Sequence, residues 1–157
     1  LLLYLFTGFR LNELLSMELT KIDLDEGFFN GGSKSKSGKD RYVPIHSYIR
    51  YIVEKRVENN KKYLIEWEGK KLSKSQYYIF WNEMMTKLDM KHTPHECRHT
   101  FRTKLDSAGA NKKCIDLMMG HKSKDVGERT YTHKTLEELK DAIELIKFDF
   151  WVELITN

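Results

Sequence analysis

Apolar positions recur along most of this chain with the three- and four-residue spacing that places them on one face of a helix. This period predicts helices over residues 47–58, 74–88, 94–109, 111–120 and 136–146. Thr93 and Pro94 favour the start of the third of these helices, because a Thr side chain accepts hydrogen bonds from free backbone amides and Pro fits the first turn. Gly109 and Gly120 favour the ends of the third and fourth helices, since glycine adopts the left-handed backbone conformation easily.

Two shorter apolar stretches precede these helices. The run LLLYLF at residues 1–6 is typical of the end of a buried helix, and it stops at Thr7 and Gly8. The stretch RLNELLSM at residues 10–17 has its leucines at helical spacing, which predicts a second helix after the glycine turn.

A small sheet is predicted between these two helices and the later ones. Turn-forming residues at 25–27 and 37–38 separate β-prone pieces around 28–29 and 42–43. We therefore expect a mostly α (α+β) fold, in which a helical domain carries a small antiparallel β-sheet near its N-terminal end. The second turn makes a lysine-rich hairpin.

Length and composition indicate one soluble domain. The chain has 157 residues, of which 40% are hydrophobic and 32% charged, and its longest apolar run is far too short to cross a membrane. Neither Cys97 nor Cys114 belongs to a disulfide or metal-binding pattern, so we expect both thiols to be reduced and buried, as in a cytoplasmic protein. The chain opens without Met inside an apolar run, which suggests that an N-terminal partner domain is absent.

Charge adds a weak indication of a polyanionic partner. The net charge is +4 and the pI is near 8.9. The lysines cluster in SKSKSGKDR, NNKK, GKKLSKS and HKSK, which are typical of loops and turns. These clusters are either solvated surface or contacts to nucleic-acid phosphates, and charge alone leaves both interpretations open.

The stretch TPHECRHTF at residues 93–101 supports two incompatible interpretations. His95 and His99 fit H-E-x-x-H, the zinc-binding pattern of a metalloprotease helix. His95 and Arg98 instead fit H-x-x-R at a helix N-terminus, where free amides and the helix dipole favour an anion such as a phosphate. The first interpretation predicts a peptidase, and the second predicts an enzyme that breaks DNA.

The zinc interpretation requires a third protein ligand downstream. Arg102 and Leu105 occupy the positions that a Gly and a His would take in the longer metalloprotease pattern, and no Glu follows before His121. Arg98 would also place a permanent positive charge beside the metal. The sequence therefore favours the phosphate interpretation, without a metal.

Four more residues with suitable chemistry lie elsewhere in the sequence. Arg10 begins the second predicted helix, and Lys36 lies in the predicted hairpin. His121 follows the terminal glycine of a helix, and Tyr131 comes ten residues later. Each has an ordinary alternative role: an ion pair with Glu13 or a surface cap for Arg10, a solvated lysine, a helix-capping histidine and a half-buried tyrosine.

In this order the residues resemble the catalytic domain of the tyrosine recombinases, the phage integrase family. The family pattern T-G-x-R-x-x-E-[IL] is matched by Thr7, Gly8, Arg10, Glu13 and Leu14. H-x-L-R-H-[ST]-[FA] is matched by His95, Arg98, His99, Thr100 and Phe101, with Cys97 in place of Leu. L-[LM]-G-H is matched by Met118, Met119, Gly120 and His121, and Y-x-H by Tyr131 and His133. Lys36 takes the place of the hairpin lysine that precedes the family's V-P pair.

The resemblance covers nearly the whole chain, and five motifs in this order are highly specific. Two departures are small. The spacing from His121 to Tyr131 is one residue longer than is common, so the loop that carries the tyrosine is expected to differ in path. Cys97 is expected to change packing only, because its helical position faces the core together with Phe101.

The resemblance implies cleavage and rejoining of DNA strands without metal, ATP or another cofactor. Tyr131 would attack the phosphorus and form a 3′-phosphotyrosyl intermediate, while Arg10 and Arg98 neutralise the developing charge. His95 would accept the phenol proton, and Lys36 would protonate the 5′-oxygen that leaves.

The remaining residues of the motifs would support this site. His121 would hydrogen-bond the phosphate, and Glu13 would buttress the site without reacting. His99 and His133 are expected to be structural.

The resemblance also implies partners and a domain arrangement. The substrate would be double-stranded DNA, bound by a tetramer of this chain with accessory DNA-bending proteins as further candidates and no membrane. Residues 1–157 would be a single C-terminal catalytic domain that lacks its N-terminal DNA-binding domain. Residues 135–157 would form a helix and tail that either cover their own domain or dock on a neighbouring protomer.

The expected biological role is integration or excision of a phage or mobile element, by a bacterial or phage-encoded cytoplasmic protein. Two alternatives remain within the same resemblance. A type IB topoisomerase shares the chemistry but rejoins the same strand, and an inactive relative would bind DNA without cutting it.

Overall fold

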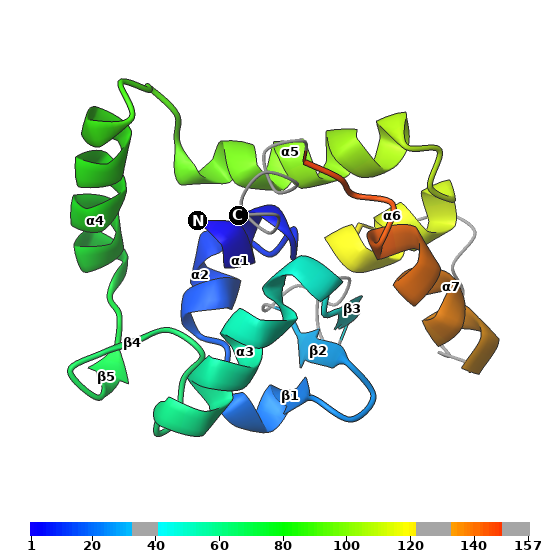
Figure 1. Ribbon diagram of the computed structural model, residues 1–157, viewed down its shortest axis with the longest axis horizontal. Coiled ribbons are helices and arrows are strands. Elements are labelled where there is room, and N and C mark those ends of the chain that lie inside the picture. The colour runs from blue at the N-terminus through cyan, green and yellow to red at the C-terminus, as the bar shows by residue number, and fades with distance from the viewer. Residues whose placement is uncertain (33–40, 122–132, 149–157) are drawn as a thin grey trace, which may run out of the picture.

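The computed structural model describes residues 1–32, 41–121 and 133–148, and it is mostly helical as the sequence predicts (Figure 1). Within these ranges the helices are α1 (Leu2–Leu5), α2 (Leu11–Leu15), α3 (Ser47–Asn59), α4 (Lys74–Lys87), α5 (Pro94–Ser107), α6 (Lys112–Met119) and α7 (His133–Ile143). A short 3₁₀ helix, η1 (Leu19–Lys21), follows α2.

The predicted antiparallel sheet is present near the N-terminal end. Its three strands are β1 (Ile22–Asp23), β2 (Phe28–Gly31) and β3 (Arg41–Pro44), and they lie in sequence order. Phe29 pairs with Ile22 on one side and with Val43 on the other. A separate hairpin, β4 (Glu66–Trp67) with β5 (Lys70–Lys71), was not predicted, because its strands are too short to show an alternating pattern.

Helix α2 is shorter than the sequence predicts, and this part of the prediction is wrong. The helix ends at Leu15, and the following residues leave it to pair with a distant loop. The backbone amide of Leu64 donates to the Met17 carbonyl at 2.9 Å, and Glu18 forms an isolated bridge with Tyr63. Local periodicity cannot reveal such a partner more than forty residues away.

Helix α5 extends across the molecule above α1, and α4 stands to one side of it (Figure 1). Gly8 allows the close contact between the turn after α1 and this long helix. Its φ is +59°, and a Cβ atom there would lie 2.4 Å from Cδ1 of Phe101. Phe101 and Cys97 both face the core, as the sequence predicts. The turn after α1 is thereby fixed against α5, and this fixes the start of the segment that carries Arg10.

Helices α6 and α7 contact β3 and each other on the far side of α5 from α4 (Figure 1). Gly120 ends α6 in the left-handed conformation with φ +67°, and Gly109 follows α5 with φ +76°, both as predicted. Helix α7 begins at His133 and ends at Ile143, three residues earlier at each end than predicted. Beyond the helix end, the Ile146 carbonyl accepts a hydrogen bond from the ring of His46 at 2.9 Å.

The end of the described chain packs on its own domain. The Glu144 carboxylate accepts hydrogen bonds from the Ser47 amide at 2.6 Å and the Ser47 hydroxyl at 2.7 Å, at the start of α3. Ile146 is fully buried, and the ring of Phe148 meets that of Phe6 edge-on at 5.2 Å. Docking on a neighbouring protomer therefore stays a prediction for residues 149–157, which lie outside the described ranges.

Cys97 and Cys114 are both buried free thiols, as predicted. Burial raises the pKa of Cys97 to about 11, so this thiol stays protonated and unreactive. Among the helices that the structure describes, none combines the length and apolar character needed to cross a bilayer.

Candidate active site

An open cleft of about 830 Å³ lies between α2, α4 and the start of α5. Arg10 and Glu13 line it from α2, His95 lines it from α5, and Lys74 and Tyr78 line it from α4. The end of β2 completes the wall at residues 30–32. Two of the predicted catalytic residues, Arg10 and His95, thus lie on one cavity together with Glu13, although they are far apart in the sequence.

Arg10 immediately precedes α2 and is held by Glu13. The Glu13 carboxylate accepts a hydrogen bond from the Arg10 backbone amide at 2.8 Å and from its Nη1 at 3.1 Å. The Arg10 side chain is 42% exposed, so its guanidinium remains accessible from the cleft. An arginine in this position can donate several hydrogen bonds to a bound phosphate.

Arg41 was not identified from the sequence. It is the first residue of β3 and is fully buried, with Nη2 donating to Glu13 Oε2 at 2.7 Å and Nη1 to Oε1 at 3.3 Å. Its guanidinium also lies over the Phe9 ring at 4.6 Å. Strand alternation was the one signal that could have identified it, because Arg41 shares the inward face of β3 with Val43. That signal is weak, since arginine is rarely buried in this way.

Glu13 is ionised at neutral pH despite its burial. Burial by itself raises the pKa of the carboxyl group, but hydrogen bonding and charge from Arg41, with a smaller contribution from Arg10, lower the pKa to about 2. The predicted supporting role of Glu13 is consistent with this geometry, since the carboxylate joins the cleft to the sheet.

Arg98 connects three segments that are distant in the sequence. Its Nη1 donates to the carbonyl of Gly8, and its Nη2 donates to the carbonyl of Met119 at 2.5 Å and lies 3.4 Å from Nε2 of His121. The residue is only 4% exposed. Burial, then the charges of Arg10 and Arg41, lower the pKa of Arg98 to about 10, so it is still a cation at neutral pH.

His121 follows α6 and faces both Arg98 and Asp116. Arginine can only donate, so Nε2 of His121 accepts the contact from Arg98 and the ring hydrogen lies on Nδ1, 3.6 Å from Asp116 Oδ1. Burial and the charges of Arg98 and Arg102 lower the pKa of His121, which favours this neutral form. Arg98 is therefore near enough to Arg10 for their charges to interact, and it contacts His121 directly.

The His95 and His99 rings lie on the exposed side of α5. Their centroids are 4.7 Å apart and their planes are perpendicular. In the described part of the chain, no third His, Cys, Asp or Glu joins them in a group that could hold a metal ion. The Glu96 carboxylate instead accepts a hydrogen bond from the Thr93 amide and helps to start α5. The described residues thus contain no zinc site of the kind that the H-E-x-x-H pattern would form.

Two predicted catalytic residues lie outside the described ranges. Lys36 falls between β2 and β3, and Tyr131 falls between α6 and α7. Tyr4, which lines the cleft, is unsuitable as a nucleophile. It is 1% exposed, and burial raises its pKa to about 12, so the phenol stays protonated and shielded.

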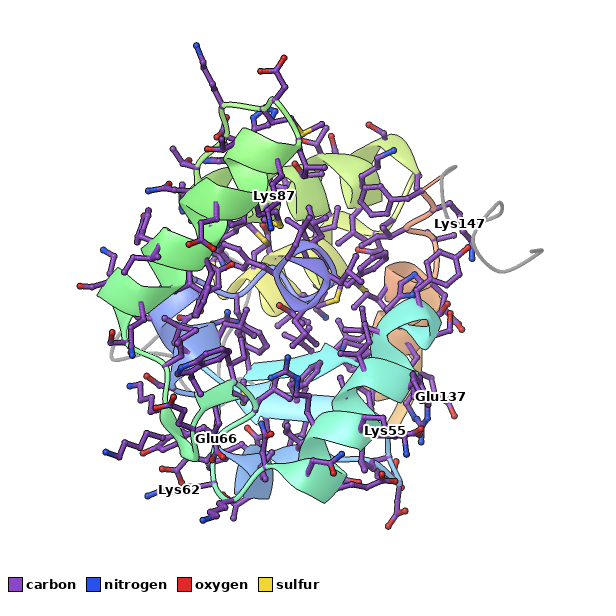
Figure 2. The ribbon with its side chains drawn as sticks, turned by 60° about the vertical axis from the view of Figure 1, so that its left-hand side comes forward. Lys55, Lys62, Glu66, Lys87, Glu137 and Lys147 are labelled. Atoms are coloured by element: carbon purple, nitrogen blue, oxygen red, sulfur yellow. The ribbon has the colours of Figure 1, made fainter. Side chains whose placement is uncertain are left out.

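Some of the predicted lysine contacts are occupied by acidic neighbours. Lys62 lies at the outer edge of the protein near Glu66, four residues later in the chain (Figure 2), and it pairs with Glu18 at 3.4 Å. Lys55 lies on α3, outside the lysine clusters of the sequence, and it pairs with Glu58 at 2.9 Å. Lys74, by contrast, is one of the residues that line the cleft.

Comparison with known proteins identifies the family of this chain. Residues 1–138 match the Phage integrase family, and the chain belongs to that family. It is 33% identical over 153 residues to tyrosine recombinase XerA of Pyrococcus furiosus, covering 92% of this chain and 52% of the relative. It is 29% identical over 148 residues to tyrosine recombinase XerD of Halalkalibacterium halodurans, covering 87% of this chain and 48% of the relative. The chain spans about half the length of these curated relatives.

Solved structures show the same fold. An integrase from mycobacterium phage Brujita has a TM-score of 0.72 at 19% identity, covering 99% of this chain and 55% of that one. A crystal structure of XerA recombinase has a TM-score of 0.64 at 22% identity, covering 98% of this chain and 54% of that one. The Tn1549 transposon integrase in complex with circular intermediate DNA has a TM-score of 0.65 at 19% identity, covering 98% of this chain and 54% of that one.

Proposed function

We propose that this chain is the catalytic domain of a site-specific DNA recombinase that cleaves and rejoins strands through a 3′-phosphotyrosyl intermediate. One observation carries the proposal. Arg98 holds the Gly8 turn and the end of α6 against α5 and contacts His121, while Arg10, which follows that turn, and His95 line the cleft. Membership of the phage integrase family supports the same chemistry.

The charged residues would bind the scissile phosphate. Arg10, half-exposed at the cleft, would donate directly to a non-bridging oxygen. Arg98 lies deeper and adds its positive charge beneath the phosphate while its donors hold the surrounding backbone. Loss of one such electrostatic contact typically lowers a rate by about 100- to 1,000-fold.

Tyr131 would be the nucleophile. Its phenolic oxygen would form a bond to phosphorus while the bond from phosphorus to the 5′-oxygen breaks. His95 would accept the phenol proton, and Lys36 would give a proton to the 5′-oxygen. A 5′-hydroxyl of another strand can reverse these steps, because the phosphotyrosyl bond keeps the energy of the original phosphodiester.

His121 would change its protonation when the phosphate binds. In the structure its Nε2 accepts a contact from Arg98, so this nitrogen cannot donate to an anion while the ring is neutral. A bound phosphate opposes the positive charge of Arg98 and raises the pKa of His121, which favours the doubly protonated ring. The ring can then donate to a phosphate oxygen, as we predict for this residue.

We further infer the partners from the proposed chemistry. The substrate is double-stranded DNA, which also forms complexes with the structurally similar Tn1549 integrase. Exchange between two duplexes needs four active sites, so a tetramer on DNA is expected, with accessory DNA-bending proteins as further partners. A role in integration or excision of a mobile element, in the cytoplasm of a bacterial host, follows from the same proposal.

The proposal can be tested by trapping the covalent intermediate. The protein is incubated with a pool of nicked duplexes of randomised sequence, in which a short fragment with a 5′-hydroxyl diffuses away after cleavage and prevents rejoining. We expect an adduct that survives SDS with the wild-type chain and with Tyr78→Phe, but not with Tyr131→Phe. DNA binding without any adduct would instead indicate an inactive relative.

A second reaction separates recombinase from topoisomerase activity. The trapped adduct is given a new duplex with a free 5′-hydroxyl, and supercoiled plasmid is treated in parallel. Joining to the new duplex is the expected result. Relaxation of the plasmid with no joining between duplexes would favour the type IB topoisomerase alternative.

A further inference from the structure

Arg41 is a buried cation outside the motifs from which the site was predicted. It is 0% exposed and is absent from the lining of the cleft, so it does not contact DNA there. Both of its terminal nitrogens instead meet the two oxygens of Glu13, at 2.7 and 3.3 Å. A forked contact of this kind fixes the direction as well as the distance of a carboxylate.

Glu13 lies between this buried arginine and the exposed one in the cleft. Oε1 meets Nη1 of both Arg41 and Arg10, at 3.3 and 3.1 Å, and Oε2 accepts from Arg41 Nη2 and from the Arg10 amide. The carboxylate therefore fixes the Arg10 backbone and side chain together. The Phe9 ring lies under the Arg41 guanidinium at 4.6 Å and limits its movement.

We propose that Arg41 is a positioning residue for Arg10, because it orients the Glu13 carboxylate that holds the Arg10 guanidinium at the cleft. The consequence for catalysis rests on the proposed recombinase function. The structural part, a dependence of Glu13 and Arg10 on Arg41, does not rest on it.

The charges around Glu13 explain why Arg41 is needed. Arg10 faces the carboxylate from the start of α2, Arg41 faces it from β3, and Arg98 contributes its charge from α5. Burial favours the protonated form of Glu13, and Arg41 is the largest influence against it. Without Arg41 the carboxyl group protonates more readily, and a neutral carboxyl holds Arg10 less firmly.

The first test uses the protein without DNA. Carbon-13 NMR follows the titration of the Glu13 carboxyl, and nitrogen-15 NMR follows the Nε–H group of Arg10. In Arg41→Met the titration midpoint of Glu13 should move up and the Arg10 signal should shift or broaden. The matched control is Arg50→Met, which removes an exposed arginine paired with Glu54 on α3 and should change neither signal. An unchanged Glu13 midpoint in Arg41→Met would overturn the proposal.

The second test measures the rate of covalent adduct formation against pH. The ratio of Arg41→Met to wild type should fall as the pH is lowered, by up to about tenfold per pH unit below the new Glu13 midpoint. Taking the ratio removes the pH dependence that both proteins share. A ratio that is constant with pH would mean that Arg41 has only a general structural role and would overturn the proposal.

The variant Glu13→Gln tests whether Arg41 acts on Arg10 through the charge of Glu13. If Arg41 acts through the charge of Glu13, then adding Arg41→Met to Glu13→Gln should produce no further pH dependence. Persistence of that pH dependence in the double variant would contradict the proposed route.

Failure of the proposal is distinguishable from failure of the proposed function. If the wild type forms no adduct, the recombinase function fails, while the NMR titration still decides whether Arg41 controls Glu13. If Arg41→Met does not fold, Arg41→Lys carries the same tests. It keeps a cation but cannot fork onto both oxygens, so we expect an intermediate shift of the Glu13 midpoint and of the rate ratio.

Discussion

Arg10 and Arg98 have the same side chain and the same proposed substrate, but the protein holds them in opposite ways. Arg98 is 4% exposed and donates to two backbone carbonyls from different segments. The Arg10 side chain is 42% exposed and is held by a carboxylate. One arginine is therefore part of the framework of the site, and the other is a contact presented by that framework. Substitution should affect stability and activity together at Arg98, but mainly activity at Arg10.

Arg98→Ala should have the largest effect. It leaves the buried carbonyls of Gly8 and Met119 without a charged donor, so the free energy of unfolding should fall by about 2–4 kcal/mol. Adduct formation should also fall beyond detection. Urea unfolding and SDS trapping measure the two effects, and an unchanged unfolding free energy would contradict the framework role.

Arg10→Ala should separate activity from stability. Adduct formation should fall by about 100- to 1,000-fold, because a direct donor to the phosphate is lost. The free energy of unfolding should change by less than about 1 kcal/mol, since the exposed ion pair contributes little and Glu13 keeps Arg41. Comparison with Arg98→Ala in the same urea titration is the check. Equal destabilisation of both variants would remove the distinction between them.

The ion pairs of Glu13 with Arg10 and Arg41 predict how the free energy of unfolding depends on pH. The pKa of Glu13 is about 2 in the folded protein, below its ordinary value, so its contribution is fully present above about pH 4.5 and is lost as the pH falls toward 2. That contribution is about 3 kcal/mol. Urea unfolding from pH 7 to pH 2 should show a smaller loss in Glu13→Gln than in the wild type. Parallel curves for the two proteins would show that Glu13 does not titrate in this way.

Gly8→Ala should have the smallest of these effects and act on the framework alone. The added Cβ would lie 2.4 Å from the Phe101 ring at a φ of +59°. We expect a loss of about 1–3 kcal/mol in the free energy of unfolding. The variant Gly109→Ala is a matched control, because its φ of +76° is similar but no atom lies within 4 Å of the added Cβ. Equal losses in the two variants would show that contact with Phe101 contributes nothing.

How much the sequence could predict depends on whether a feature is local or rests on contacts between distant residues. Helices, the small sheet and the glycine stops were predictable because periodicity and turn chemistry are local. The residues Arg10, His95, Arg98 and His121 could be proposed for the site because they match the family motifs in their order along the chain. The shortness of α2 was not, because it depends on a loop around Leu64.

Contacts between residues distant in the sequence, at the site and elsewhere, were also missed. Arg41 and His46 make contacts with Glu13 and Ile146 that span 28 and 100 residues. An isolated Arg or His in a sequence carries no sign of such a partner. Likewise, H-x-x-R suggested that Arg98 faces a phosphate, but it could not show that two carbonyls occupy its donors.

The most direct test of the account is to identify the residue that becomes linked to DNA. The trapped adduct is digested with nuclease and protease, and mass spectrometry locates the remaining nucleotide on a peptide. We predict a single modified site at Tyr131, joined to a 3′-phosphate, with the signal lost in Tyr131→Phe and kept in Tyr78→Phe. A nucleotide attached to any other residue, or an adduct that persists in Tyr131→Phe, would contradict the assignment of Tyr131 as the nucleophile.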